Sequence, residues 1–224
     1  MENNLKIDIN EVLRYLGYRG QEITNELMEE VEEAIKESKS LLKVKYVCKE
    51  FKITKNNSEI LLEGTNLRLK GKDIFNLLQN SDKCILMAAT VGSDIERKIK
   101  FYSKINLTKA LILDSCATAA VEEVCNNLQE SIGREMLKGE ENFTFRYSPG
   151  YGDLSLDIQK DFISILDCER KIGVKVSSNM LLFPRKSVTA ILGITNKKQN
   201  RDRCKECSNF ERCNYRKGDK RCGR

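Results

Sequence analysis

Apolar residues recur at helical spacing in several stretches of this 224-residue chain, with polar residues between them. The pattern predicts a short helix over residues 9–16 that ends at Gly17. A second helix is predicted after Thr24, whose side chain can cap it. Two more helices are predicted, from Asp94 to Tyr102 and from Asp157 to Cys168.

The longest periodic stretch runs from about residue 107 to residue 137. Its apolar positions advance by three or four residues, which predicts one long helix with a core-facing side. Asp114 interrupts this stripe, and we expect a carboxylate on a core-facing side to be paired or functional. The stripe consists of Leu107, Leu111, Asp114, Ala117, Val121, Val124, Leu128 and Ile132.

Other stretches are rich in β-branched and apolar residues. Residues 43–53 and 59–69 predict a hairpin or two neighbouring strands around a polar turn. The apolar run Cys84–Thr90 predicts a buried strand, residues 141–146 another, and residues 174–194 a further pair. Strands and helices alternate without a regular βαβ rhythm. We therefore expect an α+β fold, with a mainly antiparallel sheet flanked by helices and a Cys-rich C-terminal tail.

The amino-acid composition excludes several classes of function for this chain. Apolar residues make up 40% of the chain, enough for one core or one core with an appendage. No apolar run reaches membrane-span length and the first residues lack signal-peptide features, so we expect a cytoplasmic protein without membrane contact. The chain contains no histidine, which excludes Ser-His and Cys-His nucleophile pairs and histidine-ligated metals within it. The formal charge of +6 lies mostly beyond residue 200, and the near-neutral body carries no nucleic-acid-binding motif, so we expect no nucleic-acid partner.

The C-terminal tail is a separate chemical feature. It has too few apolar residues to fold alone, whereas metal–thiolate bonds could order it. Four cysteines fit a four-iron cluster or a structural zinc site, and the lack of a repeated CxxC pair favours iron–sulfur. The alternative is a disordered basic tail with free thiols. The four candidate ligands are Cys204, Cys207, Cys213 and Cys222, and the cysteines interpreted as small core residues are Cys48, Cys84, Cys116, Cys125 and Cys168.

The best candidate for a small-molecule site is the segment 146–153, which reads RYSPGYGD. Pro149 fixes its own φ, while Gly150 and Gly152 permit φ values closed to other residues, so the backbone can turn sharply and approach a ligand. Arg146 offers a planar fork for a carboxylate or phosphate, and Tyr151 offers a ring face to a cation or a flat macrocycle. An ordinary Pro-Gly turn is the alternative interpretation.

This segment resembles the RxxPGY signature of the activation (reactivation) domain of cobalamin (vitamin B12)-dependent methionine synthase, which binds S-adenosylmethionine. Residues 173–191 are similar to a second region of that domain, and the resemblance covers roughly residues 80–195. The opening residues 11–20 and the tail resemble the free-standing bacterial activation subunit. The implied organisation is N-terminal helices and a strand pair over residues 1–80, an S-adenosylmethionine-binding core over 81–196, and a basic Cys-rich tail over 197–224.

The resemblance also implies a role in methionine biosynthesis. The chain would present S-adenosylmethionine for reductive methylation of oxidised cobalamin on a methionine synthase or related corrinoid protein, with a flavodoxin or ferredoxin-like electron donor. It would thus be a component that supports a methyltransferase. Arg146 would bind the donor's carboxylate, Ser148 and Gly150 would make backbone contacts, and Tyr151 would lie toward the corrin. No catalytic acid or base is implied, because the chain contributes positioning.

Asp94 and Asp114 are candidates for the family's acidic ligand. Two other functions stay open. The tail could carry an iron–sulfur cluster that activates a related corrinoid methyltransferase, or the chain could be a non-catalytic assembly factor with a structural zinc tail.

Overall fold

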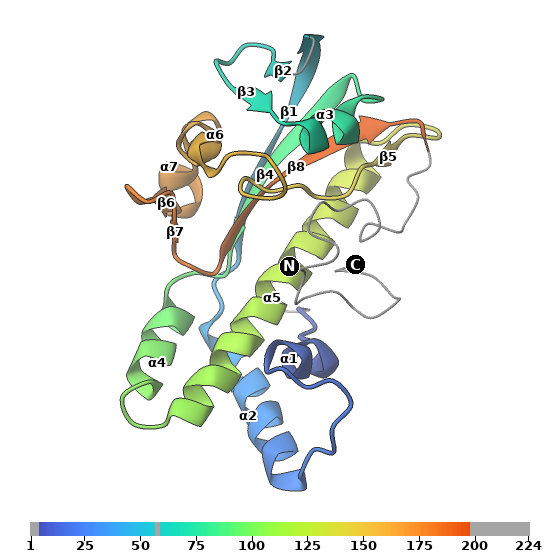
Figure 1. Cartoon of the computed structure of the whole chain (residues 1–224). Helices are drawn as coiled ribbons and strands as arrows, with labels where there is room; N and C mark the ends of the chain where they lie inside the picture. Colours follow the sequence, from blue (N-terminus) through green and yellow to red (C-terminus); the bar gives the residue numbers. More distant parts are fainter. Residues whose placement is uncertain (1–4, 57–58, 198–224) are drawn as a thin grey trace. The chain divides into compact units, whose positions relative to one another are not determined.

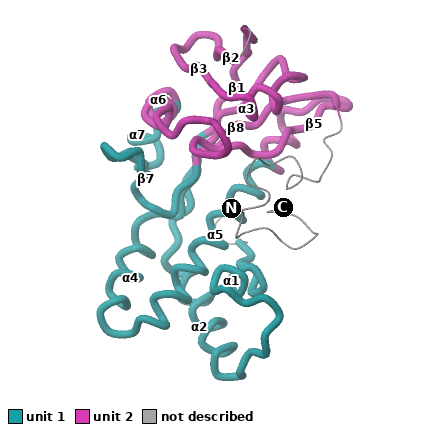
Figure 2. Tube along the Cα trace, in the orientation of Figure 1, with its two compact units in different colours: residues 1–47, 88–129, 166–188 teal, residues 48–87, 130–165, 189–224 magenta. Residues whose placement is uncertain are grey.

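The computed structural model describes residues 5–56 and 59–197, which fold into two compact units of interleaved segments (Figure 2). Unit 1 comprises residues 1–47, 88–129 and 166–188, and unit 2 comprises residues 48–87, 130–165 and 189–224. The predicted α+β class is confirmed, with a six-stranded sheet and helices in the described part of the chain (Figure 1).

The sheet lies mainly in unit 2 and has the strand order β3-β2-β1-β4-β8-β5. Its β1–β2, β2–β3 and β5–β8 pairs are antiparallel, as expected. The predicted hairpin is confirmed by the pairing of Ile53 with Leu62 and of Asn56 with Glu59. The predicted single strand over residues 59–69 is wrong, because this stretch forms two strands, β2 and β3, that pair with each other. The strands are β1 (Lys45–Asn56), β2 (Glu59–Leu62), β3 (Arg68–Lys70), β4 (Lys83–Thr90), β5 (Asn142–Phe143) and β8 (Ser187–Thr195).

The core of unit 2 forms between this sheet's apolar side chains and short helices. β4 is buried from Cys84 onward, which confirms the buried strand that its apolar run predicts. Phe162 is fully buried, and burial of such a side chain contributes about 1.5–3 kcal/mol. The other elements with residues in this unit are α3 (Lys72–Leu78), the 3₁₀ turn η2 (Leu156–Ile158), α6 (Gln159–Leu166) and the end of α5 (Leu107–Met136).

Unit 1 is mainly helical. The Asp8 side chain accepts a hydrogen bond from the Asn10 amide at the start of α1, and the Thr24 side chain accepts one from Leu27 at the start of α2. These caps satisfy amides that a helix leaves unpaired at its first turn. Besides most of α5, the unit contains α1 (Ile9–Tyr15), α2 (Asn25–Leu41), α4 (Asp94–Tyr102), α7 (Cys168–Ile172) and the antiparallel pair β6 (Lys175–Val176) and β7 (Leu182–Phe183).

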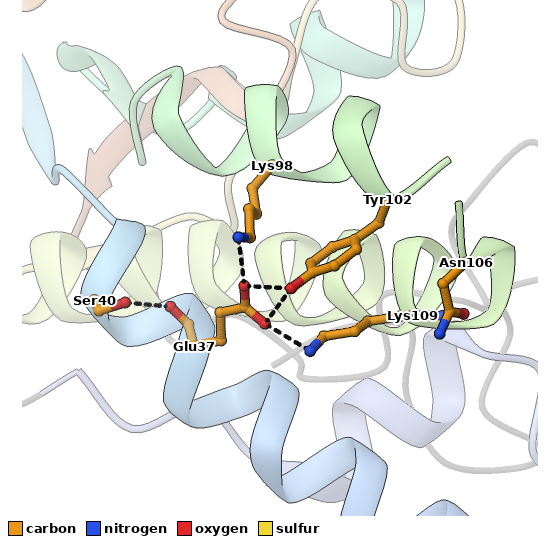
Figure 3. A network of polar contacts seen from close by, with 6 residues as sticks. All are labelled: Glu37, Ser40, Lys98, Tyr102, Asn106 and Lys109. Carbon is orange, nitrogen blue, oxygen red and sulfur yellow. Dashed lines mark hydrogen bonds and ion pairs between the residues drawn. The ribbon is translucent and has the colours of Figure 1, made fainter. Parts of the chain in front are cut away.

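A carboxylate links three helices of unit 1 (Figure 3). Glu37 of α2 accepts a hydrogen bond of 2.9 Å from the hydroxyl of Tyr102 at the end of α4. Its carboxylate also lies 3.4 Å from Lys98 Nζ and 3.2 Å from Lys109 Nζ, on α4 and α5. Both ammonium groups lie over the face of the Tyr102 ring. Lys98 Nζ is 5.0 Å and Lys109 Nζ is 4.8 Å from the ring centroid. This cluster of opposite charges and one aromatic ring fixes α2 against α4 and α5.

The long helix forms as predicted, but the first two residues of the predicted stripe do not face the interior. Leu107 and Leu111, expected on the core-facing stripe, are 64% and 56% exposed. Ala110 and Leu113 are buried instead. The later positions of the predicted stripe are buried as expected, namely Ala117, Val121, Val124, Leu128 and Ile132. The sequence does not predict the buried face of the first turns, because this segment carries leucine or isoleucine on more than one side.

Candidate functional site

The predicted ligand segment is a compact loop of unit 2, anchored to the sheet at its start. Tyr147 pairs with Ile191 of β8 through two backbone hydrogen bonds, of 3.0 and 2.8 Å. The Tyr151 amide then donates to the Ser148 carbonyl at 3.0 Å, which closes a turn with Pro149 and Gly150 at its centre. Gly150 has a φ of 88°, as the third position of a type II turn requires. The sharp bend expected from Pro149 and Gly150 is therefore present.

The second half of the loop closes on the first. The Leu154 amide donates to the Tyr151 carbonyl at 3.0 Å, and the Gly150 amide donates to the Leu154 carbonyl at 2.9 Å. Leu154 and Pro149 are buried, whereas the side chain of Tyr151 is 55% exposed. The loop therefore rests on an apolar base and presents an aromatic ring to solvent.

Two tyrosines of the loop form an aromatic pair. The rings of Tyr147 and Tyr151 meet edge to face, with centroids 5.9 Å apart and planes at 74°. This geometry suits the quadrupoles of the two rings. Tyr147 is buried, and its hydroxyl lies 3.4 Å from Asp73 Oδ2 of α3. The exposed ring is thus supported by a buried one that reaches a carboxylate.

A second carboxylate joins the loop to the same helix. Asp153 Oδ2 accepts a hydrogen bond of 2.6 Å from the Lys72 amide, and its Oδ1 accepts one of 3.2 Å from the Asp73 amide. These amides belong to the first turn of α3, where the helix itself offers no acceptor. Asp153 therefore acts as a cap for α3 supplied from about 80 residues further along the chain.

The loop suits a small molecule that carries a carboxylate. Arg146 is half-buried at the start of the loop, and a guanidinium in partly desolvated surroundings binds a carboxylate more strongly than an exposed one. Gly150 has no side chain and a φ of 88°, so the backbone can be approached closely there, whereas the space beside Gly152 is occupied by Asp73 and Tyr147. The four predicted ligand-binding residues, Arg146, Ser148, Gly150 and Tyr151, lie on one ordered loop, and their contacts with a ligand stay a prediction.

Both candidates for an additional acidic ligand form ion pairs in unit 1. Asp94 lies 2.7 Å from Lys43 Nζ and also contacts Arg97. Asp114, at the half-exposed face of α5, lies 2.9 Å from Lys186 Nζ, which also donates to the Thr118 hydroxyl at 2.7 Å. Asp114, which interrupts the apolar stripe, is therefore a paired carboxylate.

The predicted metal ligands Cys204, Cys207, Cys213 and Cys222 lie outside the described residues. Within residues 5–56 and 59–197, no group of three or more Cys, Asp or Glu side chains is placed to hold a metal ion. Nor is any helix in this part of the chain long and apolar enough to cross a membrane. The metal site stays a prediction for the tail.

The loop and the sheet together define the class of fold, an α+β domain with a Pro-Gly loop anchored to β8. A crystal structure of the MetH reactivation domain bound to AdoHcy matches this chain with a TM-score of 0.65. The match covers 88% of this chain and 81% of that chain, at 12% sequence identity. No family model and no curated protein sequence matches the chain. The chain thus has the fold of the MetH reactivation domain, which confirms the fold that the RxxPGY resemblance implies.

Sequence reasoning missed Asp73 and Asp153 as parts of this site. Asp153 directly follows the glycines of the motif, but its partners on α3 are distant in sequence. Gly71 carries the signal that could have pointed to the contact. Its φ of 141° is closed to most residues, and a Cβ there would lie 2.5 Å from Asp153 Oδ1.

Proposed function

We propose that the chain binds S-adenosylmethionine at the 146–153 loop and supports reductive methylation of oxidised cobalamin on a separate cobalamin-dependent methionine synthase. The observation that carries the proposal is the combination of this ordered loop with the fold of a reactivation domain whose crystal structure holds AdoHcy. AdoHcy is S-adenosylmethionine without the transferred methyl group, so a site for one has most of the shape needed for the other.

The residues of the loop fit such a donor. The donor carries an amino-acid carboxylate, and Arg146 offers it a charge-assisted, bidentate partner. Ser148 and Gly150 bring backbone groups close, since Gly150 has no side chain and a φ of 88°. Tyr151 presents an exposed ring, which suits contact with the flat corrin of a docking partner.

When bound, the donor would supply a methyl group to the reduced cobalt of the partner and would leave as S-adenosylhomocysteine. The chain's own contribution is to hold the donor in one orientation and to exclude others. No proton has to be moved by a side chain in this step, so the lack of histidine in the chain is compatible with it. The electron that reduces the cobalt comes from a separate donor, for which a flavodoxin or ferredoxin-like protein is our expectation.

Calorimetric titration with S-adenosylhomocysteine tests the binding site. We expect wild-type protein to bind it and Arg146→Ala to bind it more weakly by about 1.5–3 kcal/mol, roughly 10- to 100-fold in Kd, because a charge-assisted hydrogen bond is lost. Arg134→Ala is the matched control, since Arg134 is an exposed arginine of the same unit outside the loop.

The control variant should bind as wild type does. Equal affinities of Arg146→Ala and Arg134→Ala would remove Arg146 from the site. A wild-type protein that binds neither S-adenosylhomocysteine nor S-adenosylmethionine would refute the proposed function.

A further inference from the structure

The first turn of α3 supports the ligand loop at two points. Asp153 of the loop accepts hydrogen bonds from the Lys72 and Asp73 amides, at 2.6 and 3.2 Å. Tyr147 of the loop reaches Asp73 Oδ2 with its hydroxyl, at 3.4 Å. These contacts lie on either side of the turn that holds Gly150 and Tyr151. The helix therefore fixes both ends of the segment that carries the proposed ligand contacts.

Gly152 shows how closely the loop rests on α3. A Cβ at this position would overlap both Asp73 Oδ2 and the Tyr147 hydroxyl, at separations that real Cβ atoms do not show. On the other side of the contact, a Cβ at Gly71 would lie 2.5 Å from Asp153 Oδ1. Both glycines thus permit this close approach, and a larger residue at either position would have to displace the Asp73, Tyr147 or Asp153 side chain.

The contacts with α3 also support the exposed ring of Tyr151, through Tyr147. Tyr147 is held at its backbone by Ile191 of β8 and at its hydroxyl by Asp73, and its ring meets the Tyr151 ring in an edge-to-face arrangement. A change at Asp73 or Gly152 would therefore move Tyr147 first and Tyr151 next. Because a misplacement of about 1 Å in a positioning group is enough to weaken function strongly, this route matters for binding.

We propose that Asp73 and Asp153 are positioning residues, and that the first turn of α3 sets the conformation in which the loop receives its ligand. This inference rests on the proposed binding of S-adenosylmethionine at the loop. It assigns no ligand contact to either carboxylate. It predicts that ligand affinity depends on α3 and that ligand binding, in turn, stabilises the first turn of α3, since such coupling is reciprocal.

A matched pair of glycine variants tests the proposal. Gly152 has a φ of 51° and Gly139 a φ of 58°, so alanine introduces nearly the same backbone strain at both positions. Only at Gly152 does the new methyl group meet α3 and Tyr147, because nothing lies within 4 Å of a Cβ at Gly139. We expect Gly152→Ala to weaken S-adenosylhomocysteine binding by roughly tenfold or more and Gly139→Ala to leave it unchanged, by calorimetry.

A second pair covers the case in which Gly152→Ala fails to fold. Asp153→Ala removes both acceptors for the α3 amides, whereas Asp153→Asn keeps one carbonyl oxygen as an acceptor. We expect the alanine variant to bind S-adenosylhomocysteine more weakly and the asparagine variant to recover part of the affinity. Hydrogen exchange provides the independent readout: ligand should slow exchange of the Lys72 and Asp73 amides in wild type, and less so in Asp153→Ala.

The outcomes separate this proposal from the proposed function. If wild type binds the ligand but Gly152→Ala and Asp153→Ala bind it equally well, the positioning role is wrong and the binding site stands. The same holds if ligand leaves exchange of the Lys72 and Asp73 amides unchanged. If wild type does not bind the ligand, both proposals fail.

Discussion

At the scale of single residues, the buried cysteines behave as apolar side chains. Cys84, Cys116, Cys125 and Cys168 are buried, as predicted, and Cys48 is half-buried. Burial, with a smaller contribution from Glu50, raises the pKa of Cys84 to about 12. Burial likewise raises the pKa of Cys168 to about 12 and that of Cys116 to about 11. At neutral pH these thiols are protonated and poor nucleophiles.

Timed alkylation with iodoacetamide at pH 8 should show this protection. Because the thiolate is the reactive species, we expect Cys84, Cys116 and Cys168 to stay unmodified in native protein while the half-buried Cys48 reacts. Mass spectrometry of peptides measures each site, and protein unfolded in guanidinium, in which all sites should react, is the control. Labelling of Cys84 as fast as Cys48 in native protein would contradict the prediction.

The 146–153 loop shows which features can be predicted from the local sequence and which cannot. The turn at Pro149 and Gly150 follows from the φ preferences of these two residues, so it could be predicted from sequence. The contact of Asp153 with α3 could not, because it joins residues about 80 positions apart and no local spacing encodes it.

At the scale of elements, the Glu37 cluster holds α2 against α4 and α5 (Figure 3). Burial by itself would raise the pKa of Glu37, but the hydrogen bond from Tyr102 and the ion pairs with Lys109 and Lys98 lower it overall. A carboxylate with a lowered folded-state pKa stabilises the protein above its unfolded pKa of about 4.3. That contribution is lost as the pH falls through the folded-state value.

Urea unfolding of Glu37→Gln tests this contribution. We expect the variant to lose about 1 kcal/mol of unfolding free energy at pH 7, the upper end for solvent-accessible pairs. At pH 3 the difference from wild type should shrink, because protonated Glu37 no longer pairs with Lys98 and Lys109. Glu33→Gln, an exposed position on the same helix, should change little. A loss for Glu37→Gln that is independent of pH would contradict the electrostatic explanation.

The elements also show where periodicity succeeds and fails. The predicted bounds of the 94–102 helix agree with α4, and the buried run at Cys84 is β4. The long helix was predicted, but its buried face near Leu107 was not, because a segment with apolar residues on several sides does not define one face. Segment 141–146 forms only the two-residue β5 and a bridge at Tyr147.

At the scale of the whole molecule, fold similarity extends over most of the chain although sequence identity to the MetH reactivation domain is 12%. A six-stranded sheet and its helices tolerate exchange of one apolar residue for another when volume and pattern are kept. The 146–153 loop is more restricted, because Gly150 has a φ of 88°, which is closed to most side chains.

Transfer of a labelled methyl group tests the central claim most directly. A cobalamin-dependent methionine synthase that lacks a reactivation domain of its own, with oxidised cobalamin, would be incubated with a one-electron reductant, methyl-labelled S-adenosylmethionine and this chain. The account predicts that label appears on cobalamin when wild-type chain is present, and much more slowly with Arg146→Ala. Equal rates of cobalamin labelling with and without the chain would contradict it.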